Sequence, residues 1–211
     1  MAPHGEGRRP AKQQERSLLT RGALLDAAAR EIDKYGYGGM AMHRIANEVG
    51  VTTGALTFHF PTKDRLLAEL MEVGFARIQE RVGEVAQRPA APLHRARSLL
   101  LALLELLHRD VLARAAVRLS GEVPEAGDWS ESWFQQAREM FRSAGERGQL
   151  REGVTPEAVT DMALRLITGT EVCARGNDAR SEGSEAARAL FAHLCDLLLY
   201  GISAIRPPGA G

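Results

Sequence analysis

Residues 41–60 read AMHRIANEVGVTTGALTFHF, and the spacing of apolar residues in this stretch predicts two short helices. In its first half, apolar residues recur at i, i+3, i+4 and i+7, the spacing of a helix that buries one face. These residues are Met42, Ile45, Ala46 and Val49. Gly50 ends the first helix and permits a sharp turn, and a second helix is predicted over about residues 52–59, limited by Pro61. Two helices joined in this way form a helix-turn-helix.

The second of these helices presents small polar side chains once its apolar residues are packed. Leu56 and Phe60 are expected to anchor it to the core. A helix with such a surface fits the major groove of DNA, where threonine hydroxyls bond bases or phosphates and the Ala55 methyl meets a thymine methyl. The predicted DNA-binding residues are Arg44, Thr52, Thr53, Gly54, Ala55, Thr57, His59 and Lys63. An ordinary helical hairpin with solvated threonines is the alternative interpretation.

Helical spacing continues through nearly the whole chain, and no alternating pattern runs far enough to build a sheet. The prediction is an all-α protein of about nine helices. A first helix is expected over about residues 17–35 and a later one over 129–146. The predicted domains are a flexible basic arm at 1–16, a helix-turn-helix domain at 17–65 and a helical effector-binding and dimerisation domain at 66–206.

Composition limits the classes of protein that the chain can belong to. Its 211 residues are 45% apolar and 26% charged, with 27 basic and 27 acidic side chains, which is ordinary for a globular protein. The longest apolar runs, such as residues 99–104, are far shorter than the ~20 residues of a membrane span. The N-terminal residues show no secretory signal, and two cysteines suit a reducing compartment. We therefore expect a cytoplasmic protein without a membrane partner.

Two stretches of the N-terminal third, AAAREIDKYGY and RIANEVGVTTGALTFHFPTKDRLL, resemble the DNA-binding domain of TetR-family transcriptional regulators. The string GALTFHFPTK is similar to the γ-butyrolactone-receptor branch of that family. Thr57 stands where the family generally has tyrosine, and Thr53 where lysine is frequent. Residues 40–42 replace the Thr or Ser that commonly caps the first helix of the motif. The resemblance implies DNA binding and leaves the operator sequence open. The basic N-terminal residues Arg8, Arg9, Lys12, Arg16 and Arg21 resemble arms that reach the DNA backbone or minor groove, but a disordered tail is the interpretation that we favour.

The remainder of the chain holds no catalytic residues, no metal ligands at metal-type spacing and no phosphate loop, so neither an enzyme nor a cofactor is predicted. Trp129 and Trp133 are spaced i, i+4 beside Phe134, which suits an aromatic wall of an apolar cavity or plain core packing. The resemblance to butyrolactone receptors favours the cavity. It implies that Trp133 and Thr168 lie in an effector pocket and that Glu171 stands where glutamine is frequent. The predicted ligand-binding residues are Trp129, Trp133, Phe134, Thr168 and Glu171.

The last two helices carry wide apolar faces, which resemble the dimer interface of the family. The residues expected there are Val159, Met162 and Leu166, with Leu190, Leu194 and Leu198. Burial inside one subunit is the alternative, but one helix-turn-helix reads only half of a palindromic site. We therefore expect a homodimeric repressor that binds a palindromic DNA operator. A small lactone- or furan-like effector would release it, in the control of secondary metabolism or antibiotic production. A broad-specificity sensor of drugs or aromatic compounds, a ligand-independent regulator and a helical enzyme are the other interpretations.

Overall fold

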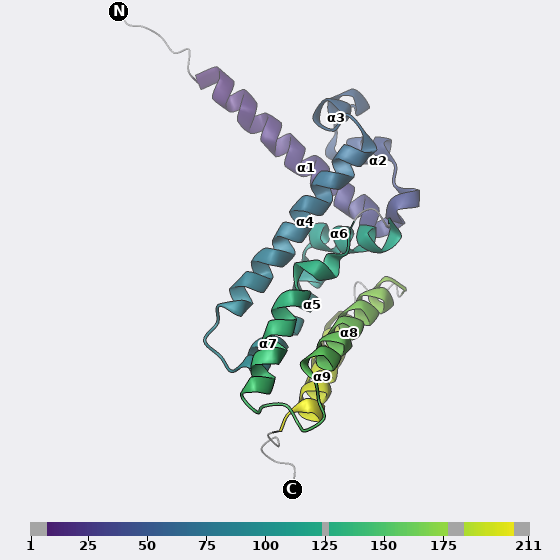
Figure 1. The fold of residues 1–211 in the computed structure, drawn as a ribbon. Coiled ribbons are helices and arrows are strands. Elements are labelled where there is room, and N and C mark those ends of the chain that lie inside the picture. The colour runs from purple at the N-terminus through teal and green to yellow at the C-terminus, as the bar shows by residue number, and fades with distance from the viewer. Residues whose placement is uncertain (1–7, 124–126, 177–183, 205–211) are drawn as a thin grey trace, which may run out of the picture. The chain divides into compact units, whose positions relative to one another are not determined.

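The computed structural model describes residues 8–123, 127–176 and 184–204, and within these ranges the chain forms nine α-helices (Figure 1). The helices are α1 (Arg8–Gly39), α2 (Met42–Val49), α3 (Thr53–His59), α4 (Lys63–Ala86), α5 (Pro92–Arg109), α6 (Val111–Glu122), α7 (Phe134–Glu146), α8 (Pro156–Gly176) and α9 (Ser184–Ile202), with a short 3-10 helix, η2 (Trp129–Ser132). The predicted all-α fold is confirmed for these residues. None of the described helices is both long enough and apolar enough to cross a membrane.

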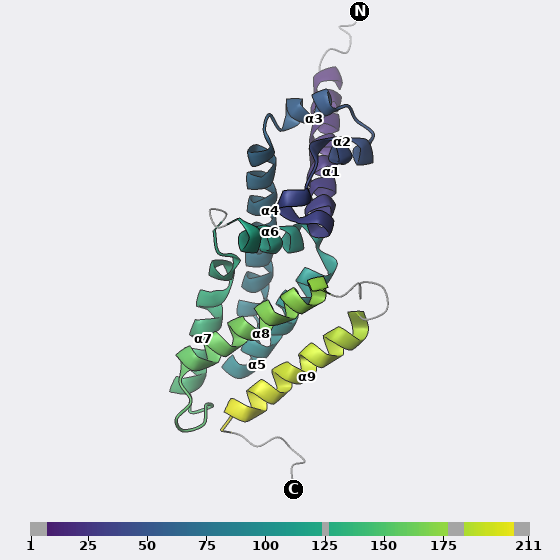
Figure 2. The same cartoon turned by 90° about the vertical axis from the view of Figure 1, so that its right-hand side faces the viewer.

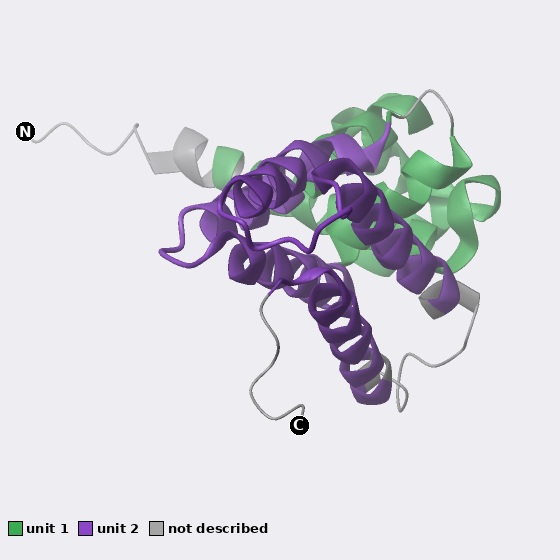
Figure 3. Ribbon diagram, turned by 60° about the horizontal axis from the view of Figure 1, so that its bottom comes forward, with its two compact units in different colours: residues 1–74, 111–127 green, residues 75–110, 128–211 purple. Residues whose placement is uncertain are grey.

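The chain divides into two compact units, coloured separately in Figure 3. Unit 1 comprises residues 1–74 and 111–127, and unit 2 comprises residues 75–110 and 128–211. This division falls inside α4, after residue 74, whereas the predicted domain boundary lies after residue 65. The prediction also assigned α6 to the second domain, whereas α6 packs on α1 in unit 1. That packing joins residues far apart in the sequence, so the local spacing of apolar residues does not predict it.

Helix α1 extends beyond the predicted residues 17–35 at both ends. It begins at Arg8, so residues 8–16 are helical where a flexible arm was expected, and residues 1–7 lie outside the described part. Near its other end Gly36 takes φ 72° and ψ −178°, and the helix kinks there before it ends at Gly39. This left-handed φ is one that glycine adopts without steric cost.

The helix-turn-helix of unit 1 is seated on α1. Helix α2 packs against both α1 and α3, as Figure 2 shows. The core beneath it consists of apolar side chains that are at most 1% exposed, and its largest members are Leu24, Ile32, Ile45, Leu56, Phe60, Leu66 and Leu70. The predicted anchors Leu56 and Phe60 are thus confirmed. They fix α3, the helix predicted to enter the major groove and called the reading helix below, to a well-packed core.

In unit 2, α5 contacts α7, α8 and α9. The predicted single helix over 129–146 is wrong, because it is interrupted at Trp133, whose φ −140° and ψ −22° are not helical. The Asp128 side chain accepts a hydrogen bond from the backbone N–H of Ser130 (2.8 Å) and starts η2, and α7 begins only at Phe134. Trp129 and Trp133 therefore belong to η2 and to the junction that follows it.

Candidate nucleic-acid interface and effector site

The turn between α2 and α3 is built from backbone hydrogen bonds that glycine makes possible. Gly50 takes φ 74° and ψ 28°, the left-handed conformation typical of a helix C-cap, and its N–H bonds back to α2. Val51 N–H donates to the carbonyl of Ala46 at 3.0 Å. The Thr52 hydroxyl oxygen then caps α3 by accepting from the N–H of Ala55 (3.1 Å). The predicted helix-turn-helix, with Gly50 at the end of its first helix, is confirmed.

The outward surface of α3 consists of the small residues that the sequence pattern predicted. Thr52, Thr53, Gly54 and Thr57 are exposed, and Ala55 and His59 are half-buried. Thr57 Oγ1 donates to the carbonyl of Gly54 at 3.0 Å, so its oxygen can still accept a hydrogen bond. The arrangement therefore offers hydroxyl groups, a methyl group and an imidazole on one short helix.

Phe58 lies on the same surface and was missing from the predicted contacts. Its side chain is 81% exposed and stands edge-on to the ring of His59, with 5.4 Å between centroids. Leu56 and Phe60 are both buried, and residue 58 lies halfway between them, about 200° around the helix. The sequence pattern that identified the two buried anchors thus also carried the signal for Phe58.

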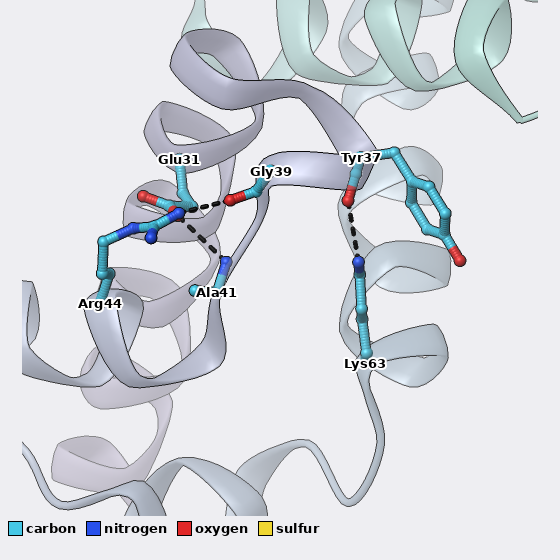
Figure 4. A network of polar contacts seen from close by, with 6 residues as sticks. All are labelled: Glu31, Tyr37, Gly39, Ala41, Arg44 and Lys63. Carbon is cyan, nitrogen blue, oxygen red and sulfur yellow. Dashed lines mark hydrogen bonds and ion pairs between the residues drawn. The ribbon is translucent and has the colours of Figure 1, made fainter.

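Lys63, the first residue of α4, is held in place by Tyr37 (Figure 4). Its Nζ donates to the Tyr37 carbonyl at 2.9 Å and lies 4.0 Å from the centre of the Tyr37 ring. Thr62 Oγ1 caps α4 by accepting from the N–H of Arg65 at 3.2 Å. A cation and a helix N-terminus therefore adjoin the reading helix, and both favour a phosphate.

Arg44, which was expected at the DNA surface, is bound within the chain instead. Its Nε donates to Glu31 at 2.7 Å and its guanidinium also donates to the Gly39 carbonyl (Figure 4). The guanidinium lies 4.6 Å from the Tyr35 ring centre. The hydrogen bond to Glu31 raises the pKa of Arg44 above its usual value. Glu31 also accepts from the N–H of Ala41 (3.1 Å), at the start of α2. Glu31 thus accepts a hydrogen bond from a backbone N–H at the start of α2, where Thr or Ser caps are absent from residues 40–42.

Arg21 likewise has a role within unit 1 and does not belong to a free arm. It donates to Glu69 of α4 at 2.8 Å and to the carbonyl of His59 at 2.7 Å, and it lies 4.4 Å from the centre of the Phe60 ring. The His59 carbonyl is one of the unpaired acceptors at the C-terminal end of α3. Arg21 therefore satisfies that end and fixes it to α4.

In unit 2, Trp133 is completely buried, and its Nε1 has no hydrogen-bond partner among the described residues. Its ring centroid lies 5.7 Å from that of Trp129, which is also buried, and 6.3 Å from that of Phe134. A buried donor without an acceptor costs about 1–3 kcal/mol. Native structures retain few such groups, and each calls for a partner.

The other two predicted ligand residues lie on α8 and differ in exposure from Trp133. Thr168 is exposed and Glu171 is half-buried. The buried line of α8 includes Val159, Ala163 and Ile167, and Thr168 is rotated from it by one residue, about 100°. The structure therefore does not place Thr168 in a buried site with Trp133.

Helices α8 and α9 carry large apolar side chains that remain in solvent. Those at least 37% exposed are Met162, Val172, Leu190, Leu194, Leu197 and Tyr200. Val159, predicted on this face, is instead 1% exposed and belongs to the core of unit 2. Within the described ranges no three His, Cys, Asp or Glu side chains group as metal ligands.

Comparison with known proteins places these features in context. Residues 24–70 match the family described as "Bacterial regulatory proteins, tetR family". The A-factor receptor protein of Streptomyces griseus is 24% identical over 202 residues, 93% of this chain and 71% of the receptor. The HTH-type transcriptional regulator PksA of Bacillus subtilis (strain 168) is 31% identical over 176 residues, 81% of this chain and 86% of PksA. A solved structure described as "Molecular basis for control of antibiotic production by a bacterial hormones" superposes with a TM-score of 0.72 at 25% identity, covering 89% of this chain and 99% of that chain.

Proposed function

The chain belongs to the tetR family of bacterial regulatory proteins and is a DNA-binding transcriptional regulator, and from this premise we propose that it is a repressor released by a small lactone-like effector. It acts as a homodimer on a palindromic operator, in the cytoplasm where the chromosome lies, and it catalyses no reaction. The genes that it controls are those of secondary metabolism or antibiotic production. This agrees with the A-factor receptor and the antibiotic-production structure that the chain resembles.

The DNA side of this proposal rests on the exposed surface of α3. Thr52, Thr53 and Thr57 present their hydroxyl groups or methyl groups to base edges, and Lys63 binds a phosphate beside them. Gly54, Ala55 and His59 complete the surface. Arg44 stabilises the start of α2 and does not contact DNA, because Glu31 and the Gly39 carbonyl already bind its guanidinium.

The single observation that carries the effector class is the buried Nε1 of Trp133 without a partner. An indole N–H is only a donor, so its missing partner must bring an acceptor atom. Trp129 and Phe134 beside it supply aromatic surface that suits an apolar skeleton. A γ-butyrolactone meets both requirements through its ring carbonyl and its alkyl chain.

The test compares a γ-butyrolactone with the cyclopentane that carries the same chain and has no acceptor atom in its ring. We expect the unaltered protein to bind the lactone about tenfold more tightly, because only the lactone satisfies the N–H of Trp133. Trp133→Phe keeps an aromatic ring and removes the N–H. In this variant the two ligands should bind with equal affinity, while operator binding stays unchanged. Isothermal titration calorimetry measures the ligands, and a gel shift measures the operator.

Three outcomes contradict the effector proposal. The first is an equal preference for the lactone in Trp133→Phe, which would place the carbonyl elsewhere. The second is tight binding of many unrelated aromatic compounds, which would identify a broad-specificity sensor. The third is the failure of every bound lactone to lower operator affinity, which would identify a ligand-independent regulator.

A further inference from the structure

Tyr37 is bonded on both sides of its backbone, and the two bonds lead to different helices. Its N–H donates to Glu122 Oε2 at 2.6 Å, from the last residue of α6. Its carbonyl accepts from Lys63 Nζ at 2.9 Å (Figure 4), and the centre of its ring lies 4.0 Å from the same ammonium group. A single residue at the end of α1 therefore connects α6 with the first residue of α4.

The local sequence makes this approach possible through Gly36. A Cβ atom at this position would lie 2.6 Å from Glu122 Oε2 and 2.7 Å from Arg118 Nη2, closer than real Cβ contacts. The left-handed φ of 72° also excludes most side chains. Glycine therefore lets the carboxylate of α6 reach the backbone of the next residue, Tyr37.

Glu122 is itself held firmly. Arg118, one turn earlier in α6, donates through Nε to Glu122 Oε1 at 2.6 Å and through Nη1 to the carbonyl of Asp33 at 2.7 Å. Arg114 adds an ion pair to the Asp33 carboxylate at 3.2 Å. Several charged hydrogen bonds thus connect the end of α6 to the end of α1, and they fix the position of Tyr37.

Lys63 gains a defined position from Tyr37. An ammonium group has three donors, and the Tyr37 carbonyl occupies one of them. A lysine already confined in this way loses less side-chain freedom when a phosphate binds its remaining donors. The position of Tyr37 therefore affects how strongly Lys63 can hold the DNA backbone.

We propose that Glu122 is a positioning residue for operator binding, which acts through Tyr37 on Lys63 without touching DNA. The inference rests on the proposed contact between Lys63 and a phosphate. It assigns to α6, a helix outside the helix-turn-helix, an indirect influence on operator affinity.

Two substitutions at one position separate the hydrogen bond from the charge. Glu122→Ala and Glu122→Gln both remove one negative charge and the ion pair to Arg118, but the glutamine oxygen can still accept from the N–H of Tyr37. Loss of a negative charge alone strengthens binding to DNA. We expect Glu122→Gln to bind operator at least as tightly as the unaltered protein. We expect Glu122→Ala to bind about three- to tenfold more weakly, with a shallower dependence of log K on log salt.

A double-mutant cycle with Lys63→Met identifies the path. Lys63→Met should lower the salt slope by about 0.9 per subunit. Adding Glu122→Ala to Lys63→Met should cause no further loss, because the residue being positioned is already gone. Fluorescence anisotropy at several salt concentrations gives both quantities, and circular dichroism melting controls for folding. Glu84→Gln, which removes an exposed carboxylate from unit 2, controls for a remote charge.

The possible outcomes separate a failure of this inference from a failure of the proposed function on which it rests. If Lys63→Met leaves affinity and slope unchanged, the proposed phosphate contact is wrong and the inference fails with it. If Lys63→Met weakens binding but the two Glu122 variants behave alike, only the inference is overturned. A further loss when Glu122→Ala is added to Lys63→Met also overturns it, since Glu122 would then act by another route.

Discussion

Phe58 is a large aromatic side chain that folding leaves in solvent. Burial of such a ring stabilises a protein by about 1.5–3 kcal/mol, and at 81% exposure this residue gains little of that. It stands beside Thr57 and His59 on the outward surface of α3, where the major groove would lie. Phenylalanine contacts the methyl groups of thymine there, so Phe58 suits a readout of A·T pairs.

We predict that Phe58→Ala weakens binding to the operator about tenfold and leaves the salt slope unchanged, because no phosphate contact is lost. The free energy of unfolding should change by less than about 0.5 kcal/mol, as is usual for an exposed position. Anisotropy titrations with operator and scrambled duplexes measure the effect. An equal loss on both duplexes would contradict a role in sequence readout.

The sequence predicted some residue roles and not others, and the difference lies in sequence separation. Gly50 as the end of α2 and Leu56 as an anchor depend on neighbours within one or two turns, so a local pattern reveals them. Arg44 and Arg21 find their carboxylate partners 13 and 48 residues away, in Glu31 and Glu69. In the sequence, an arginine near the reading helix looks like a DNA contact. Only the folded chain shows that a carboxylate of the same chain already binds it.

At the scale of elements, α4 and α6 approach each other closely at Gly74. A Cβ atom at this residue would lie 2.5 Å from Ala116 Cβ and 2.7 Å from the Leu112 carbonyl oxygen. One of these atoms belongs to the backbone, which cannot rotate away. The contact therefore depends on glycine in the middle of a helix, where glycine normally costs about 1 kcal/mol relative to alanine.

Two glycine substitutions in α4 should have opposite effects. Gly74→Ala gains about 1 kcal/mol in helix propensity, but overpacking costs about 1–3 kcal/mol, so we predict net destabilisation. Gly83→Ala is the matched control, since nothing lies within 4 Å of its Cβ position, and it should stabilise the protein. Thermal melts of the two variants measure the difference. Stabilisation by Gly74→Ala would show that α4 and α6 are not packed so closely.

Element boundaries show where periodicity reaches its limit. Apolar spacing predicted the existence of the helices but merged η2 and α7 into one helix, because 3-10 and α-helical turns carry similar apolar patterns over four residues. The resemblance to butyrolactone receptors implied that Thr168 lies in a pocket, although the buried residue of that turn is Ile167. A one-residue shift on a helix turns a side chain by about 100°, which decides between core and solvent.

At the scale of the whole molecule, the exposed apolar face of α8 and α9 calls for a partner. On α9, Leu190, Leu194 and Leu197 recur at i, i+4 and i+7 and form one stripe, with Tyr200 near its end. Contiguous apolar patches of this kind mark protein–protein interfaces. A second copy of the chain is the partner that the proposed function requires, because the proposed palindromic operator presents two identical half-sites about 34 Å apart.

We predict that Leu194→Glu converts the protein to a monomer, because it places a carboxylate at the centre of this stripe. Sedimentation velocity should give a dimer for the unaltered chain and a monomer for the variant. Leu19→Glu, which alters an exposed leucine of unit 1, should remain dimeric. Operator affinity of the Leu194→Glu monomer should fall by at least about a hundredfold, because two linked reading helices bind far more tightly than one. On a duplex with a single half-site, the unaltered protein and Leu194→Glu should bind with the same affinity per subunit. A loss of affinity on the full palindrome alone would then show that the α9 stripe forms the dimer interface. A Leu194→Glu protein that stays dimeric and binds the palindrome at full strength would place the subunit interface elsewhere.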